Sequence, residues 1–148
     1  MFAFVFRMLG RRGERALVED LTQDVFVNVH RGLPRWQPAG PARLSTWILT
    51  IATHVTINQL RRREWRTEPL GVRAEALPAP TRDVALALVV RDALEQLSPD
   101  HRAVIVLREY HELEYEEIAA ALAIDVGTVR SRLSRARAVL RTLLEKHT

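Results

Sequence analysis

Two segments that contain several prolines and glycines divide the sequence and limit the helices it can form. Residues 32–41, Gly-Leu-Pro-Arg-Trp-Gln-Pro-Ala-Gly-Pro, contain three prolines and two glycines, and residues 64–81 contain three prolines and one glycine. Because proline has no amide hydrogen and clashes with the preceding helical turn, neither segment can continue a helix. We expect the first to be a loop and the second to be a linker between domains.

The segments between these breaks carry apolar residues at helical spacing. Val18, Leu21, Val25 and Val29 recur every three or four residues and mark one helical face, which we expect to be core. Further along, Ser98-Pro99-Asp100 has the residues of a helix start: an N-cap, a proline at the first position and an acid near the positive end. The helices predicted before it cover about residues 2–9, 17–31, 44–63 and 84–97.

The fold class predicted from this pattern is all-α, with two small helical domains joined by a linker. No segment alternates as a strand would, and no internal repeat is visible. A chain of 148 residues has room for such an arrangement. The first domain is assigned to residues 1–63, the linker to 64–83 and the second domain to 84–148.

Charge is distributed unevenly along the chain. The formal net charge is +4, from 22 basic and 18 acidic residues. Residues 127–148 contain six Arg or Lys and one acid, whereas residues 109–117 contain five Glu and neither Arg nor Lys. A basic C-terminal segment behind an acidic one suggests a polyanionic partner bound in one orientation. DNA would repel the acidic residues, so we expect them to face away from it or to meet a positive group.

Several function classes find no support in the sequence. There is no cysteine, and the five histidines lack metal-ligand spacing, so no disulfide, metal or other cofactor is expected, and a reducing cytoplasm fits. An enzyme would need a glycine-rich phosphate loop, a nucleophile elbow or an oriented acid–base pair, and none is recognisable. The apolar opening, residues 1–6, is ended by Arg7 and is far shorter than the roughly 20 residues of a membrane span. Because its positive charge follows the apolar run, we interpret it as a buried helix instead of a signal peptide.

A helix-turn-helix is predicted near the C-terminus. Residues 116–122 form a short helix with apolar residues on one side, and residues 123–126 have the length of a tight turn. Asp125 suits the N-cap of a second helix that begins at Val126. Two short helices joined by a four-residue turn follow the plan of this DNA-binding motif.

The second helix of this motif has one apolar and one polar side on a helical wheel. The stripe expected to pack on the domain is Val129, Leu133, Ala136 and Leu140. Opposite it lie the small residues Gly127, Ser131, Ser134 and Ala138, flanked by Arg130 and Arg135. Small residues let a helix approach base edges closely, and guanidinium groups can reach guanine O6 and N7 or phosphates. Arg132 and Arg137 lie nearer the packed edge and suit phosphates, although a merely solvated, charged face is the alternative.

Two blocks of residues occur in a fixed order on either side of the linker. The first consists of Glu19-Asp-Leu-Thr-Gln-Asp-Val-Phe26, Ser45-Thr-Trp47, Ile51-Ala52 and Asn58-Gln-Leu-Arg-Arg-Arg63. The second consists of Leu97-Ser-Pro-Asp-His-Arg102, Tyr115-Glu-Glu-Ile-Ala119 and Val126-Gly-Thr-Val-Arg-Ser-Arg-Leu133. Together they resemble the extracytoplasmic-function group of bacterial sigma factors, which keep only sigma domains two and four. The resemblance covers nearly the whole chain and implies a factor that directs RNA polymerase to promoters.

This resemblance implies roles for particular residues. The helix that docks on the clamp coiled coil of the largest polymerase subunit is matched by Asp20, Gln23, Asp24 and Phe26. The loop that captures a flipped base of the −10 element is matched by Pro38, Ala39, Gly40, Pro41 and Ala42, and the adjoining −10 surface by Trp47, His54, Asn58, Arg61, Arg62 and Arg63. The −35 element would be read by Gly127, Thr128, Arg130, Ser131, Arg132, Ser134 and Arg135. The implied partners are core RNA polymerase, promoter DNA and an anti-sigma factor, without membrane insertion.

Several of these residues have a structural alternative. Phe26 could be core, and Trp47, which like Trp36 could stack on bases, could equally be core. The chain also departs from the family. His54 stands where relatives often have Asn, which leaves the base preference open, and Ala123 stands where such turns often carry Gly. The sequence also begins late in the first helix that relatives have, so either the true start lies upstream or the first domain is shortened.

Two other functions are compatible with parts of the sequence. A dimeric helix-turn-helix regulator would explain residues 115–140 as well, but it leaves Asp20 to Phe26, the proline-containing loop and the arginine triplet at residues 61–63 unexplained. An enzyme using Asp20 and Asp24 would need a cleft that perturbs their protonation, and the sequence indicates none.

Overall fold

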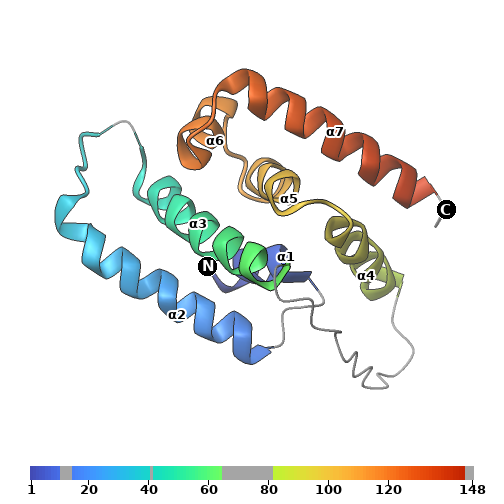
Figure 1. Cartoon of the computed structure of the whole chain (residues 1–148), viewed down its shortest axis with the longest axis horizontal. Helices are drawn as coiled ribbons and strands as arrows, with labels where there is room; N and C mark the ends of the chain where they lie inside the picture. Colours follow the sequence, from blue (N-terminus) through green and yellow to red (C-terminus); the bar gives the residue numbers. More distant parts are fainter. Residues whose placement is uncertain (11–14, 41, 65–81, 146–148) are drawn as a thin grey trace.

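The structure is helical throughout the residues it describes, which agrees with the predicted fold class. The computed structural model describes residues 1–10, 15–40, 42–64 and 82–145 (Figure 1). Its helices are α1 Phe2–Leu9, α2 Arg15–Gly32, η2 Leu33–Arg35, α3 Leu44–Glu64, α4 Arg82–Glu95, α5 Pro99–Ile105, η3 Val106–Tyr110, α6 Tyr115–Leu122 and α7 Val126–Glu145. The predicted helices are present with bounds shifted by at most about two residues. Most of the predicted linker, residues 65–81, lies outside the described part.

Helices α1, α2 and α3 pack together in the N-terminal part of the chain (Figure 1). The predicted stripe on α2 is confirmed: Val18, Leu21 and Val25 are buried, and Val29 packs against the same core. Helix α1 contributes four buried residues, Phe4, Val5, Met8 and Leu9. This short apolar helix is therefore core, as expected from the sequence.

Helix α3 lies between the N-terminal and C-terminal helices. It contacts α1 and α2 on one side and α5 and α6 on the other. Three of its threonines, Thr46, Thr53 and Thr56, are buried, and the hydroxyls of Thr53 and Thr56 each donate to the carbonyl four residues earlier at 2.7 Å. A buried hydroxyl needs such a partner, so threonine can fill these positions without an unsatisfied polar group. Helix α3 can thereby pack against α1 and α2 and also against α5 and α6, although its apolar residues do not form a single stripe.

Helix α5 begins as the sequence predicts and ends in an unexpected way. The Ser98 hydroxyl accepts a hydrogen bond from the His101 amide, and Pro99 occupies the first turn, which confirms the predicted N-cap. At its other end, α5 continues into a π-helical turn, Val106–Tyr110, that the sequence did not indicate. From within this turn, the Arg108 guanidinium donates to the Leu113 carbonyl at 2.8 Å and so holds the segment that leads to α6.

Helices α6 and α7 form the predicted helix-turn-helix. Ala123 has the left-handed conformation, φ 53° and ψ 45°, and the Ile124 amide donates to the Ala119 carbonyl at 3.0 Å, so the turn closes without a glycine. Asp125 caps α7, since its carboxylate accepts hydrogen bonds from the Thr128 amide at 2.9 Å and from the Thr128 hydroxyl at 2.8 Å. These bonds, the amide first, lower the pKa of Asp125. The N-cap predicted from the sequence is confirmed.

One buried arginine joins α1 to the C-terminal helices. Arg102, which is 6 % exposed, donates to the carbonyls of Leu94 at 2.9 Å, Glu95 at 3.0 Å and Leu97 at 3.2 Å, and also to that of Met8. Three of these carbonyls lie at the end of α4 and in the turn before α5, and the fourth lies in the last turn of α1. A helix end leaves carbonyls without helical partners, and the guanidinium supplies donors to several at once.

Replacing Arg102 should therefore destabilise the whole fold. We expect Arg102→Ala to lower the free energy of unfolding by about 2–3 kcal/mol, because buried carbonyl groups lose their donors. Urea unfolding followed by circular dichroism measures this loss. Arg141→Ala, at an exposed position of α7, is the control and should shift the midpoint little. Equal stability of the two variants would contradict the role assigned to Arg102.

Replacing Asp125 should loosen the start of α7 in a way that depends on pH. The pKa of Asp125 is lowered in the folded chain, so its contribution is present above the unfolded value of about 3.9 and is lost as the pH falls through the folded value. We expect Asp125→Ala to speed hydrogen exchange of the Thr128 and Val129 amides near neutral pH, whereas Asp125→Asn keeps a capping oxygen. In strong acid the natural chain should exchange these amides as Asp125→Asn does, because the protonated carboxyl also keeps one acceptor oxygen. If the natural chain and Asp125→Asn already exchange alike near neutral pH, the charge of the carboxylate adds nothing to the cap.

Candidate nucleic-acid interface

The solvent-facing side of α7 is the one that the helical wheel predicts. Val129, Leu133 and Ala136 are buried, and Leu140 packs against the core. The small residues of the opposite side are exposed, as are the two flanking arginines: Gly127, Ser131, Ser134, Ala138, Arg130 and Arg135. Neither Arg130 nor Arg135 has an ion pair within the described part of the chain, so both are available to an external anion.

The hydroxyl groups near the start of α7 are held in place. Thr128 is bound by Asp125, and the Ser131 hydroxyl donates to the Thr128 carbonyl at 3.0 Å. The first turn of the helix therefore presents a backbone and hydroxyl groups of fixed geometry. A helix N-terminus of this kind, with small residues on its exposed side, can approach a nucleic acid closely.

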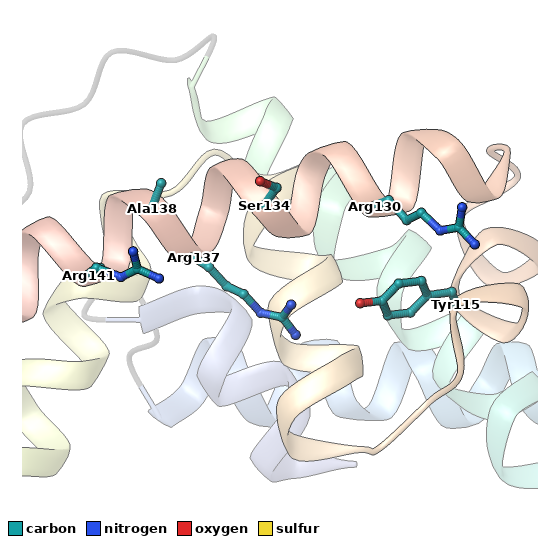
Figure 2. Close-up of a pocket in the computed structure, with 6 residues that line it drawn as sticks. All are labelled: Tyr115, Arg130, Ser134, Arg137, Ala138 and Arg141. Atoms are coloured by element: carbon teal, nitrogen blue, oxygen red, sulfur yellow. The ribbon is translucent and has the colours of Figure 1, made fainter.

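A shallow groove of about 420 Å³ runs along one side of α7. It is lined by Tyr115, Arg130, Ser134, Arg137, Ala138 and Arg141 (Figure 2). Figure 2 shows the Tyr115 hydroxyl pointing toward the Arg137 guanidinium. The helical spacing of the α7 residues could have indicated their common side, but Tyr115 and Arg141 were not among the predicted site residues. The place of Tyr115 depends on how α6 packs on α7.

Two arginines that were expected to face phosphates are paired within the chain. Arg137 donates to Glu109 at 2.7 Å, and this bond, followed by the one to Tyr115, raises the pKa of Arg137. Arg132 lies 3.5 Å from an oxygen of Asp100. Glu109 thus meets a positive group, as expected for the acidic segment. The sequence gives no sign of these pairs, because the partners are more than 25 residues apart.

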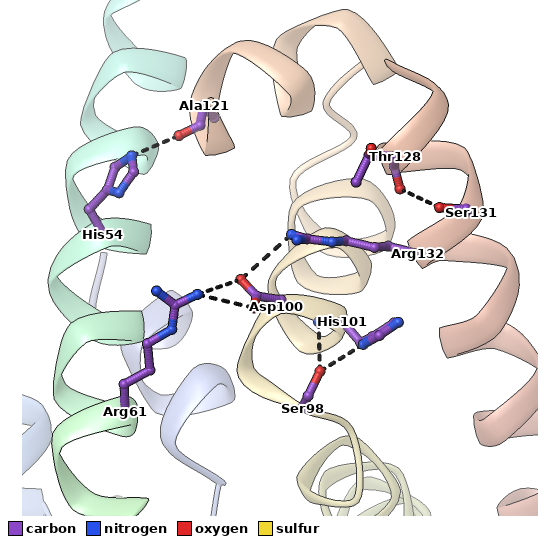
Figure 3. Close-up of polar contacts among 9 residues, drawn as sticks. All are labelled: His54, Arg61, Ser98, Asp100, His101, Ala121, Thr128, Ser131 and Arg132. Carbon is purple, nitrogen blue, oxygen red and sulfur yellow. Dashed lines mark hydrogen bonds and ion pairs between the residues drawn. The ribbon is translucent and has the colours of Figure 1, made fainter. Parts of the chain in front are cut away.

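The predicted −10 residues of α3 differ in their surroundings. His54, Asn58, Arg61 and Arg62 are exposed, whereas the side chain of Arg63 lies outside the described set. The His54 Nε2 atom lies 3.0 Å from the Ala121 carbonyl, and an Arg61 Nη2 atom lies 3.1 Å from Asp100 (Figure 3). Two of these side chains therefore contact the C-terminal helices, His54 at α6 and Arg61 at α5, which sequence reasoning missed.

The predicted −10 loop before α3 is only partly exposed, and the two tryptophans near it are half-buried. Pro38 and Ala39 are exposed, Gly40 and Ala42 are half-buried, and Pro41 lies outside the described residues. The Gly40 amide donates to the Gln37 carbonyl at 2.9 Å, so the loop contains an ordered turn. Trp36 and Trp47 are half-buried, and the Trp47 ring lies so close to Gly32 that a Cβ there would be 2.9 Å from it. Trp47 thus has one packed side.

The predicted polymerase-binding residues form an exposed surface on α2. Asp20, Gln23 and Asp24 are exposed, and the Phe26 side chain is 55 % exposed. The alternative that Phe26 is core is therefore wrong. The neighbouring Val27 is 47 % exposed, so two large apolar residues adjoin the acids. Such a surface suits a protein partner that offers both apolar and basic groups.

Within the described residues, no cluster of three or more His, Asp or Glu side chains could hold a metal ion. Among the helices described, none is both long enough and apolar enough to cross a membrane.

Two family models match the chain. "Sigma-70 region 2" matches residues 1–66, and "Sigma-70, region 4" matches residues 87–140. These segments contain the helices α1–α3 and most of α4–α7.

Curated and solved relatives agree with these models. The chain is 34% identical over 155 residues to the ECF RNA polymerase sigma factor SigE of Mycolicibacterium smegmatis, a match that covers 99% of this chain and 58% of the relative. It is 36% identical over 146 residues to the RNA polymerase sigma factor CarQ of Myxococcus xanthus, covering 95% and 80% of the two chains. The structure resembles the sigma factor RpoE of Bartonella quintana, solved in complex with the anti-sigma factor NepR, with a TM-score of 0.77, 26% identity and coverage of 97% and 89%. The chain belongs to the sigma-70 family of RNA polymerase sigma factors, in its extracytoplasmic-function group.

Proposed function

We propose that this chain directs core RNA polymerase to promoters, with residues 84–148 reading the −35 element and residues 1–63 reading and opening the −10 element. The observation that carries this proposal is the capped helix α7, which presents exposed small residues between Arg130 and Arg135. The residues between the two parts, 64–83, would serve as the linker. RNA synthesis itself would belong to the polymerase, and the factor would act in the cytoplasm, where promoter DNA lies.

The −35 element would be read in the major groove by α7. Gly127, Ser131 and Ser134 allow the helix to lie close to the base edges, and Arg130 and Arg135 extend on either side of them. A bidentate contact from arginine to guanine O6 and N7 distinguishes that base from the others. Thr128 and Arg132 would position the helix through the phosphate backbone.

The −10 element would be read by α3 and the preceding loop. Residues 38–42 would hold a flipped base, and Asn58, Arg61 and Arg62 would bind the adjoining strand. Trp47 is half-buried with its ring against Gly32, so only its exposed part would be open to stacking. His54 would contribute an imidazole in place of the amide common in relatives, with a different set of hydrogen bonds.

The exposed surface of α2 would bind the clamp coiled coil of the largest polymerase subunit. Asp20 and Asp24 supply charge, and Gln23 and Phe26 supply a hydrogen-bonding group and apolar area. We also propose that an anti-sigma factor holds the chain inactive, as NepR binds the solved relative. A dimeric helix-turn-helix regulator remains the second candidate. Sizing in solution separates the two, because a free sigma factor should be monomeric.

Arginine substitutions on α7 test the −35 assignment. We expect Arg135→Ala and Arg130→Ala each to weaken binding to the −35 duplex by about 1–3 kcal/mol if the arginine contacts a base, with relaxed specificity at that base pair. Run-off transcription with purified core polymerase on a promoter library first identifies the site, and fluorescence anisotropy then compares it with a scrambled duplex. Arg141→Ala should have little effect. An equal loss on both duplexes would show a phosphate contact and no base reading.

A charge reversal on α2 tests the polymerase interface. Asp24→Arg should abolish run-off transcription while the circular dichroism spectrum stays unchanged, because the side chain is exposed in the free chain. Glu145→Arg, an exposed reversal at the end of α7, is the control and should leave polymerase binding intact. Full activity of a folded Asp24→Arg variant would refute the interface.

A further inference from the structure

Arg137 on α7 is held by two side chains from neighbouring elements. Its Nη2 atom donates to a Glu109 carboxylate oxygen at 2.7 Å, and its Nε atom donates to the same oxygen at 3.3 Å. The Tyr115 hydroxyl points toward the same guanidinium (Figure 2). The bond to Glu109 and then the bond to Tyr115 raise the pKa of Arg137. This exposed guanidinium therefore already has acceptors within its own chain.

The π-helical turn η3 places both partners of Arg137. Glu109 belongs to this turn, and its neighbour Arg108 lies 5.3 Å from the centre of the Tyr115 ring. Arg108 is itself held, since its guanidinium lies 3.2 Å from a carboxylate oxygen of Glu114. Two consecutive residues of one turn thus hold Arg137, one directly and one through Tyr115. Turns of this type are frequent at functional sites, and this one faces the helix proposed to read DNA.

Arg137 lines the same groove as Arg130. The two residues are seven positions apart, which is about two helical turns, so they lie on the same side of α7. Arg130 is exposed and has no ion pair within the described part of the chain, whereas Arg137 is paired. An arginine beside a helix that lies in the major groove is suited to a backbone phosphate. The pairing of Arg137 therefore decides how many cations this side of α7 offers to DNA.

Glu109 and a DNA phosphate compete for Arg137. The side chains of Arg137 and Glu109 are 45% and 48% exposed, and a surface pair of this kind shifts an equilibrium by about twofold to fivefold. Transfer of Arg137 to a phosphate would also leave the Glu109 carboxylate unpaired beside a polyanion, which repels it. Both effects favour the intramolecular partner over a phosphate contact.

We propose that Glu109, assisted by Tyr115, withholds Arg137 from DNA phosphates and so limits sequence-independent DNA binding by this chain. Glu109 is a positioning residue, because it acts on DNA binding through Arg137. The inference rests on the proposed function, since it places DNA along α7. Each phosphate contact adds affinity that does not depend on sequence. A factor that binds arbitrary DNA less tightly is more available to core polymerase.

Two matched substitutions each remove one negative charge from the acidic segment. Glu109→Gln neutralises the partner of Arg137, and Glu112→Gln removes the same charge from an exposed position three residues further along. Each is made in the natural chain and together with Arg137→Gln. Fluorescence anisotropy measures the binding of the full chain to a short duplex of scrambled sequence, at salt concentrations between about 50 and 200 mM. Circular dichroism verifies that every variant is folded.

We expect Glu109→Gln to raise the affinity for the scrambled duplex about twofold to fivefold more than Glu112→Gln does. The dependence of log affinity on log salt should steepen by up to about one, because one more phosphate is contacted. This extra gain should disappear when residue 137 is also substituted. Arg137→Gln alone should leave the salt dependence nearly unchanged. If Glu109→Gln does not fold, Tyr115→Phe takes its place, with a smaller gain in the same direction.

The outcomes separate this inference from the proposed function. Equal gains from Glu109→Gln and Glu112→Gln, or a gain that persists without Arg137, would overturn the inference, because reduced repulsion alone would explain them. A flatter salt dependence for Arg137→Gln alone would also overturn it, since Arg137 would then already bind a phosphate. Equal binding of the natural chain to native and scrambled −35 duplexes would count against the proposed function. The scrambled duplex would still decide whether Arg137 is withheld.

Discussion

The arrangement of this molecule depends on one buried guanidinium. Arg102 reaches carbonyls at the end of α4, in the turn before α5 and at the end of α1, so three chain segments meet at one side chain. A lysine at this position has three donors on one atom and could not reach the same set with similar geometry. Because α5 is the first helix of the C-terminal part to contact α3, fixing α5 also fixes where the helix-turn-helix lies.

Helix α3 shows how one element can serve two neighbours. The hydroxyls of Thr50, Thr53 and Thr56 donate hydrogen bonds to backbone carbonyls four residues earlier in the same helix. These side chains can therefore pack among apolar neighbours without an unpaired polar group. The surface left over carries Thr46, His54 and Arg61, which meet the C-terminal helices through polar contacts. Beside these polar contacts, buried apolar residues of α3 belong to the same core cluster as those of α1, α2, α5 and α6. The same helix is therefore part of the core on both sides.

Features set by neighbouring residues could be predicted from the sequence, and features set by distant ones could not. The caps at Ser98 and Asp125 and the stripe at Val129, Leu133 and Ala136 depend on residues within a few positions, so helical spacing reveals them. The exposure of Gly127 and Ser131 follows from the same spacing. These local rules also give the all-α fold class and nearly all helix bounds.

The long-range contacts of the candidate site required the structure. The sequence does not indicate that Arg132 lies beside Asp100, 32 positions earlier, or that His54 lies beside the Ala121 carbonyl. The π-helical turn after α5 was missed for a related reason, since it reflects packing and not a local sequence signal. Family resemblance supplied the roles of Asp24 and Arg61, but it could not supply the intramolecular partner that Arg61 has in this arrangement.

The contact between His54 and the Ala121 carbonyl has a consequence for how the chain unfolds. That carbonyl belongs to the last turn of α6, the first helix of the helix-turn-helix. A side chain of α3 therefore helps to cap the C-terminal end of α6. In the other direction, Arg102 of the C-terminal part binds the Met8 carbonyl in the last turn of α1. Each part therefore stabilises a helix end of the other. A closed chain of this kind is expected to melt as a single cooperative unit, whereas a chain with its halves apart would melt in two steps, with the C-terminal end of α6 fraying first.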